Sequence, residues 1–156
     1  RERVETLVRV LDDVQRQAPA EGALAIVFVN KKKEADTVGK VLHRRYEGVH
    51  VLHGDIPQSA RDASLKAMRE GVGRLLVATD VAARGLDLPL LPAVVNHGMP
   101  RSIEQYIHRI GRTGRAGQSG TAHTIFVKRK DTPMAPALVR CVAEAGQEVP
   151  EALRHL

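Results

Sequence analysis

Short, unbroken apolar runs alternate with helical patterns along this chain, and this alternation limits its fold more than any other feature. Ala23 to Val29 is continuously apolar and rich in β-branched residues, as in a strand buried on both faces. Similar short runs lie at 49–53, 75–78 and 93–96, and an alternating run lies at 121–127. Strands that alternate with helices predict an α/β fold, with a mainly parallel central sheet covered by helices on both faces.

Helical patterns fill the intervals between these runs. Apolar residues recur at helical spacing from Val4 to Val14, and Pro19 breaks the pattern. Ser102 and Gln105 form a capping box, which indicates where another helix begins. The further helices predicted by these patterns cover residues 31–46, 57–71, 102–110 and 137–145.

Composition indicates one domain with a single core. The chain has 156 residues, of which 43% are hydrophobic, and we expect residues 1–156 to form a single domain. Cys141 is the only cysteine, so an internal disulfide is excluded. No apolar run approaches the length of a membrane span, and no signal peptide is visible. We therefore expect no membrane partner and an intracellular location, with nucleus, cytoplasm and organelle not distinguished.

The charge balance favours an anionic partner such as nucleic acid or nucleotide. The formal net charge is +6 and the isoelectric point is about 9.9. The chain has two Phe, two Tyr and no Trp, so it has few rings on which bases could stack. Any contact with nucleic acid should therefore go to the backbone.

Polar residues follow the first two predicted strands, where ligands of parallel sheets bind. Asn30 and the lysines at 31–33 open a helix, whose free N–H groups favour an anion. Gln58 and Arg61 follow Gly54, share one face of the next helix and could hold a phosphate. Taken alone, the lysines at 31–33 are better explained as a solvated first helical turn, and Gln58 and Arg61 could simply form a polar helix face.

Two later segments carry a denser set of polar groups. After the third strand, Thr79 offers a hydroxyl, Arg84 a charge and Asp87 an acid that could accept from a sugar hydroxyl. Three arginines then fall within the seven residues 109–115, between glycines. Like charges so close are unfavourable without an anion, and the planar guanidinium suits a transferring phosphoryl group. A solvated basic loop is the alternative, and the glycine spacing alone does not exclude it.

These segments resemble the motifs of DEAD-box RNA helicases. His-Arg-Ile-Gly-Arg-Thr-Gly-Arg at 108–115 resembles motif VI, and Leu-Val-Ala-Thr-Asp-Val-Ala-Ala-Arg-Gly-Leu-Asp at 76–87 resembles motif V. Gln58-x-x-Arg61 resembles the Q-x-x-R element, and residues 26–30 resemble motif IV. Order and spacing agree over nearly the whole chain. The resemblance implies a RecA-like three-layer sandwich that is the C-terminal lobe of an ATP-dependent RNA helicase, excised from a longer two-lobe protein.

The resemblance also implies roles for individual residues. Arg112 and Arg115 correspond to arginines that contact the γ-phosphate, with Arg115 as the arginine finger. His108 corresponds to the histidine that links the two lobes and the phosphate site, and Asp87 to the residue that binds the ATP ribose. The residues expected to hold the backbone of single-stranded or duplex RNA are Asn30, Lys31, Gly54, Gln58, Arg61, Thr79, Asp80, Arg84 and Gly85.

The chain lacks the other half of such an ATP site. It has no Gly-x-x-x-x-Gly-Lys-Ser/Thr loop, and its Lys-Glu-Ala-Asp at 33–36 lies within a predicted helix, so we assign no metal site. The family places the phosphate loop and the acidic box on an N-terminal lobe, which would hold the Mg²⁺ that accompanies ATP. We therefore expect the isolated lobe to be an inactive monomer.

Two positions depart from the family pattern, and two other functions compete. Gly98 stands where an acid is common, and Lys31 where a threonine is common. A DNA helicase or translocase is one alternative, and His108 together with the string at 83–87 argues against it. A non-catalytic scaffold lobe is the other, and the intact arginines of 109–115 disfavour it.

Overall fold

The computed structural model describes residues 1–84, 88, 90–114 and 119–156. Its five strands form one parallel sheet in the order β2-β3-β1-β4-β5. The strands are β1 (Ala25–Val29), β2 (Val49–Leu52), β3 (Leu75–Thr79), β4 (Ala93–Asn96) and β5 (Thr121–Thr124). The predicted α/β class with a parallel sheet is confirmed, and each predicted strand is present with ends that differ by at most a few residues.

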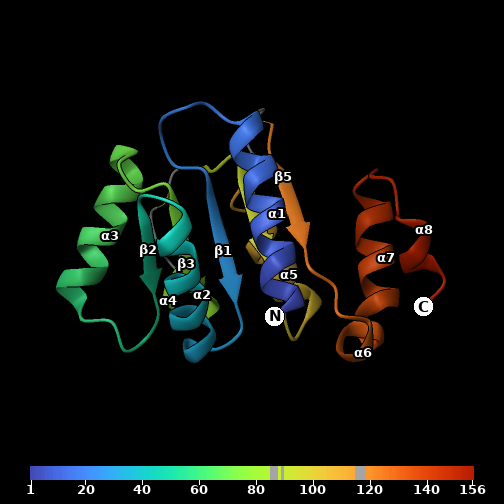
Figure 1. The fold of residues 1–156 in the computed structure, drawn as a ribbon. Helices are drawn as coiled ribbons and strands as arrows, with labels where there is room; N and C mark the ends of the chain where they lie inside the picture. Colours follow the sequence, from blue (N-terminus) through green and yellow to red (C-terminus); the bar gives the residue numbers. More distant parts are fainter. Residues whose placement is uncertain (85–87, 89, 115–118) are drawn as a thin grey trace.

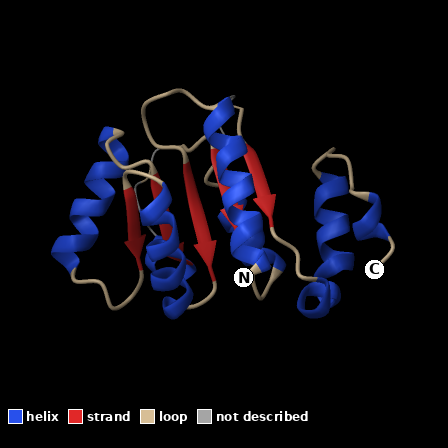
Figure 2. Ribbon diagram, in the orientation of Figure 1, coloured by secondary structure: helices blue, strands red, loops and turns tan. Residues whose placement is uncertain are grey.

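Helices cover both faces of this sheet (Figures 1 and 2). They are α1 (Glu2–Gln17), α2 (Lys32–Arg45), α3 (Gln58–Glu70), α4 (Asp80–Ala83), α5 (Ile103–Ile110), α6 (Lys128–Asp131), the 3₁₀ helix η1 (Thr132–Met134), α7 (Ala135–Glu144) and α8 (Glu151–Arg154). None of the helices among the described residues combines the length and the apolar character needed to cross a membrane.

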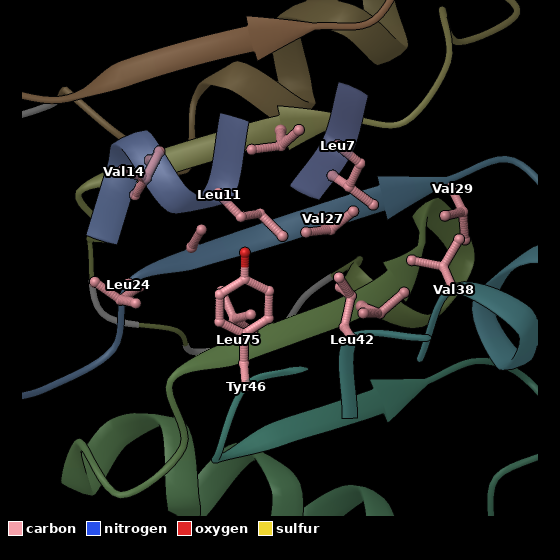
Figure 3. Packing of buried hydrophobic residues seen from close by; sticks show 14 of the residues in the cluster. Leu7, Leu11, Val14, Leu24, Val27, Val29, Val38, Leu42, Tyr46 and Leu75 are labelled. Atoms are coloured by element: carbon pink, nitrogen blue, oxygen red, sulfur yellow. The ribbon is translucent and has the colours of Figure 1, made fainter. Parts of the chain in front are cut away.

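The core is divided by the sheet into two layers, because successive strand residues point to opposite faces. In β1, Ala25, Val27 and Val29 pack toward α1 and α2, whereas Ile26 and Phe28 pack toward α3 and α4. The α1–α2 layer is drawn in Figure 3 and includes Leu7, Leu11, Val14, Val38, Leu42, Tyr46 and Leu75. This double burial explains why the strands read as continuous apolar runs.

Tyr46 closes the interface between α1 and α2. Its hydroxyl donates to Asp12 Oδ1 at 2.6 Å, and its ring points into the α1–α2 layer (Figure 3). Burial, followed by the hydrogen bond to Asp12, raises the pKa of Tyr46 to about 12. The hydroxyl therefore stays protonated and remains a donor over the physiological range.

A third cluster lies beyond β5, where α7 and α8 stand beside the sheet (Figure 1). Met99, Tyr106 of α5 and Leu138 of α7 form its buried part. Cys141 packs against this cluster as a partly buried side chain. The short helices α6 and α8 were not predicted, because four residues are too few to show a helical period.

The ends of several helices follow from particular residues. Ser102 Oγ accepts from the backbone N–H of Gln105 at 3.2 Å, which confirms half of the predicted capping box. The side chain of Gln105 accepts in return from the N–H of Arg101, one residue earlier than the box requires. Gly71 ends α3 with φ of +79°, a left-handed conformation that glycine adopts without strain.

Candidate functional site

A cavity of about 260 Å³ opens between α4 and α5, beside the carboxyl end of β1. The arrows of β1, β2 and β5 in Figure 1 all point to the same side of the molecule, so the loops after them gather there. The residues that line the cavity are Phe28, Asp80, Ala83, Arg84, Glu104, Gln105, His108, Arg109 and Arg112. Four residues proposed from the sequence, namely Asp80, Arg84, His108 and Arg112, therefore share one cavity.

Arg109 forms the floor of this cavity and is only 1% exposed. Its Nε donates to Asp80 Oδ1 at 2.8 Å, and its Nη2 donates to Asp80 Oδ2 at 2.6 Å. Two parallel hydrogen bonds between guanidinium and carboxylate give a strong, directional ion pair. The pair ties α5 to the first residue of α4, so the segments that resemble motifs V and VI are joined directly.

The remaining donors of Arg109 are also used. Nη2 donates to Asn30 Oδ1 at 2.7 Å, and Nη1 donates to Asn96 Oδ1 and to the carbonyl of Gly98, both at 3.3 Å. A guanidinium has five N–H groups, and here each has an acceptor. The guanidinium also lies 5.2 Å from the centroid of the Phe28 ring. Arg109 is thus a buried cation whose hydrogen bonds are complete within the chain.

This network shows which anion accompanies one of the arginines of 109–115. The sequence predicted that these close like charges need an anion, and for Arg109 the anion is the chain's own Asp80. Asn30 and Asp80 were expected to face RNA, yet their side chains are directed to Arg109. Asn30 also donates from Nδ2 to the carbonyl of Met99 at 3.1 Å.

The other cavity residues are more accessible. Arg112 is half-buried and donates from Nη2 to the carbonyl of Ala83 at 3.0 Å. His108 is exposed on α5, and Arg84 is exposed at the end of α4. The cavity therefore presents two arginines and a histidine on its rim, a composition suited to phosphate oxygens. Three further residues proposed from the sequence, namely Gly85, Asp87 and Arg115, lie outside the described residues.

A second group of proposed residues follows β2 and opens α3. Gly54 is exposed, and a Cβ there would lie 3.3 Å from Lys32 Cε. Gln58 is exposed and donates to Asp62 Oδ1 at 2.8 Å.

Arg61 reaches toward α4, where its Nη2 lies 3.5 Å from the carbonyl oxygen of Ala82. Lys31 is exposed at the start of α2, and Thr79 is buried at the end of β3.

Arg61 brings this second group next to the cavity. Its Nε is buried and has no hydrogen-bond partner among the described residues. A buried N–H without an acceptor is costly, and it marks a place where an added acceptor would be stabilising.

His53 fixes the turn after β2. Its Nδ1 accepts from the N–H of Asp55 at 3.2 Å, which assigns the proton to Nε2, and Nε2 lies 3.0 Å from Asp36 Oδ1. His50 contacts Ser64 instead, at 3.2 Å, so the two histidines have separate surroundings. Among the described residues, no three His, Cys, Asp or Glu side chains come together in a way that could hold a metal ion.

The loop after β4 completes the site and carries a second buried histidine. His97 is 3% exposed, and its Nδ1 has no hydrogen-bond partner in the part of the chain that is described. Burial, followed by the positive charge of Arg3, lowers the pKa of His97 to about 4. The imidazole is therefore neutral at physiological pH.

Comparison with known proteins identifies the family of this site. Residues 2–117 match the family model described as the helicase conserved C-terminal domain. The Escherichia coli DEAD-box protein SrmB, solved bound to regulator of ribonuclease activity A, is 35% identical with a TM-score of 0.76. That alignment covers 97% of this chain and 85% of the SrmB chain. This chain belongs to the DEAD-box family as a helicase C-terminal domain.

Two further relatives place the domain within longer proteins. The ATP-dependent RNA helicase dbp3 of Emericella nidulans is 45% identical over 152 residues, which are 97% of this chain and 30% of that protein. The RNA helicase Prp28 of Chaetomium thermophilum, solved with ADP, is 41% identical with a TM-score of 0.83 over 98% of this domain and 37% of that chain. The helicase C-terminal domain thus spans about a third of these relatives, and its predicted RecA-like fold is confirmed.

Several residues that hold the site of this helicase domain together were not predicted from the sequence. They are Arg109 as the centre of the network, its partner Asn96, the carbonyl of Gly98 and the ring of Phe28. Arg109 lies three residues after Tyr106 on α5, but its partner Asp80 is 29 residues away, so no local pattern marks Arg109 as buried.

Proposed function

We propose that this domain is the C-terminal lobe of a two-lobe, ATP-dependent RNA helicase, in which ATP binds between the lobes and RNA crosses both. The observation that carries the proposal is the single cavity shared by Asp80, Arg84, His108 and Arg112, where the motif V and motif VI segments meet. The names of the relatives support it, since dbp3 is called an ATP-dependent RNA helicase and Prp28 was solved with ADP.

On the ATP side, Arg112 and Arg115 bind the γ-phosphate, and Arg115 acts as the arginine finger. The half-buried position of Arg112 on the cavity rim supports this role, because a guanidinium fork there can reach two phosphate oxygens. His108 links the lobes at the phosphate site, and Asp87 accepts from the ribose. The Mg²⁺ that accompanies ATP is held by the N-terminal lobe and neutralises phosphate charge there.

On the RNA side, backbone phosphates and sugars lie along the loops after β1, β2 and β3. Lys31, Gly54, Gln58 and Arg84 are exposed there, and Arg61 is partly exposed. Thr79 and Gly85 contribute from the motif V segment. Asn30 and Asp80 contribute indirectly, since their bonds to Arg109 hold the two loops in place.

Lobe closure connects these two ligand sites. Asp80 lies at the RNA-side loop and is bonded to Arg109, which is three residues from Arg112 on the ATP side. RNA bound along the motif V loop therefore favours the position of α5 that presents the arginines to ATP. We further propose that residues 1–156 form this one lobe, that it is monomeric when isolated, and that the protein acts inside the cell.

An RNA-binding titration tests the RNA half of the proposal. Binding by the 156-residue chain should be weak and indifferent to sequence, and log affinity should fall linearly with log salt, because it depends on phosphate contacts. Arg61→Ala or Arg84→Ala should each lower affinity equally for different sequences and reduce the salt slope by about 1. Arg69→Ala, an exposed arginine at the far end of α3, is the matched control. A change in base preference in either variant would contradict backbone recognition.

A further inference from the structure

Three consecutive carbonyl groups in the loop after β4 each accept a hydrogen bond from a different element. The donors to the carbonyls of residues 97, 98 and 99 are, in that order, Arg3 Nη1 of α1 at 3.1 Å, Arg109 Nη1 of α5 at 3.3 Å and Asn30 Nδ2 at the end of β1 at 3.1 Å. The loop 97–99 therefore joins α1, α5 and β1. Arg3 is the one member of this set that belongs to none of the family motifs.

Gly98 leaves space for the side chains that converge on this loop. A Cβ at this position would lie 2.8 Å from Arg3 Nη1 and 3.8 Å from Asn30 Nδ2. Any larger side chain would therefore require the guanidinium of Arg3 to shift from its position against the carbonyl of His97.

We propose that Arg3 is a positioning residue that couples RNA binding to ATP binding. Its bond to the carbonyl of His97 fixes the loop 97–99 against α1. The next carbonyl, of Gly98, is an acceptor for Arg109, which in turn holds Asp80 and Asn30. The inference rests on the proposed function, because α1 is then the element that receives the connection from the N-terminal lobe.

Arg3 acts on this loop through the geometry of one contact rather than through its charge. Arg3 is partly exposed and makes one hydrogen bond to a backbone oxygen, so its loss leaves the core intact. What the bond restricts is the angle of α1 relative to the loop that positions Arg109. If the connection between the lobes moves when they close, this bond transmits the movement to the motif V and VI segments.

The test uses the full two-lobe protein and measures the coupling factor. This factor is the ratio of RNA affinity with and without a non-hydrolysable ATP analogue, and it equals the effect of RNA on analogue affinity. Arg3→Ala should lower the coupling factor by about fivefold, which is the change expected when the net contribution of one hydrogen bond is lost. RNA affinity without nucleotide should not change. Arg3→Lys should retain most of the factor because the contact uses a single N–H donor, and Arg9→Ala, exposed on the same helix, is the control.

A second substitution separates positioning from general destabilisation. Gly98→Ala should lower the coupling factor by displacing Arg3, and the double variant Arg3→Ala/Gly98→Ala should resemble Arg3→Ala alone. Additive losses, or a loss that Arg3→Lys does not restore, would overturn the inference. Full coupling in Arg3→Ala would overturn the inference alone, whereas a parent protein without coupling would overturn the proposed function as well.

Discussion

At the scale of single residues, Arg109 decides how the site is built. It is buried, and its five N–H groups are bonded to Asp80, Asn30, Asn96 and the carbonyl of Gly98. Removing one partner of a buried ion pair leaves the other charge without compensation, which is more costly than losing an exposed pair. Arg109 is therefore a structural residue, and its substitution should first of all lower the free energy of unfolding.

Arg109→Lys should lower the free energy of unfolding by at least about 2 kcal/mol, because lysine keeps the charge but cannot form the paired bonds to Asp80. Denaturant titration of the 156-residue chain measures this. Arg101→Lys, an exposed arginine just before α5, should change the midpoint by very little. Equal midpoints for the two variants would contradict the role assigned to Arg109.

His97 gives the domain a pH-dependent stability with a definite sign. Its pKa is about 4 in the folded protein, below its ordinary value of 6.5, so the unfolded chain binds more protons between these values. Stability from this residue is therefore complete above pH 6.5 and is lost as pH falls toward 4. Burial lowers the pKa of His50 and His123 as well, which adds to the effect in the same direction.

Between pH 7 and pH 5, the contribution of His97 should fall by about 2 kcal/mol. Denaturant midpoints at the two pH values measure it for the parent, for His97→Gln and for the exposed control His43→Gln. His97→Gln should depend less steeply on pH than the parent, and His43→Gln should match the parent. An unchanged slope in His97→Gln would show that the buried imidazole is not the group that titrates.

At the scale of elements, close packing of α2 on β2 fixes where the basic end of α2 lies. Gly39 faces Val51, and a Cβ at Gly39 would overlap the Val51 side chain. The helix can therefore approach the strand more closely than any side chain at that position would permit. This contact sets the distance between α2 and β2. It therefore also sets the position of Lys31, at the start of α2, relative to the sheet.

Gly39→Ala should destabilise the domain by about 1–2 kcal/mol, since overpacking outweighs the gain in helix propensity of about 1 kcal/mol. Thermal unfolding measures the change. The double variant Gly39→Ala/Val51→Ala should recover part of the loss, because the shorter side chain makes room for the new methyl group. A more stable Gly39→Ala variant would contradict the packing described.

The helices and strands were largely predictable from the sequence, but the buried face of α5 was not. Buried strands and the capping box of α5 are local patterns, so they could be read from the chain. Helical spacing alone would place Ile107 on the buried face with Ile103, yet Ile107 is 49% exposed and Arg109 is buried. The pairing of Arg109 with Asp80, 29 residues away, decides this, and no local pattern contains it.

At the scale of the whole molecule, the parallel sheet explains why distant motifs meet. The five strands of the described residues are parallel and end on one side, so Asn30 after β1, Asp80 after β3 and the Gly98 carbonyl after β4 all reach Arg109 of α5. That convergence was predictable from fold class. The different roles of the arginines were not predictable, because they depend on which guanidinium forms an ion pair with a carboxylate inside the domain. Arg109 does so by pairing with Asp80, and we propose that Arg112 and Arg115 are the arginines that face ATP.

The most direct test of these roles is ATP turnover by the two-lobe protein at saturating RNA, with the 156-residue chain alone as the inactive baseline. Arg115→Lys should reduce turnover by about 10³ or more, because an arginine finger acts on charge that develops in the transition state. Arg112→Lys should also reduce it, and neither should weaken RNA binding without nucleotide. Arg101→Lys, exposed and outside the cavity, should hydrolyse ATP like the parent. Turnover at the parental rate in Arg115→Lys would contradict the assignment of this lobe as the source of the finger.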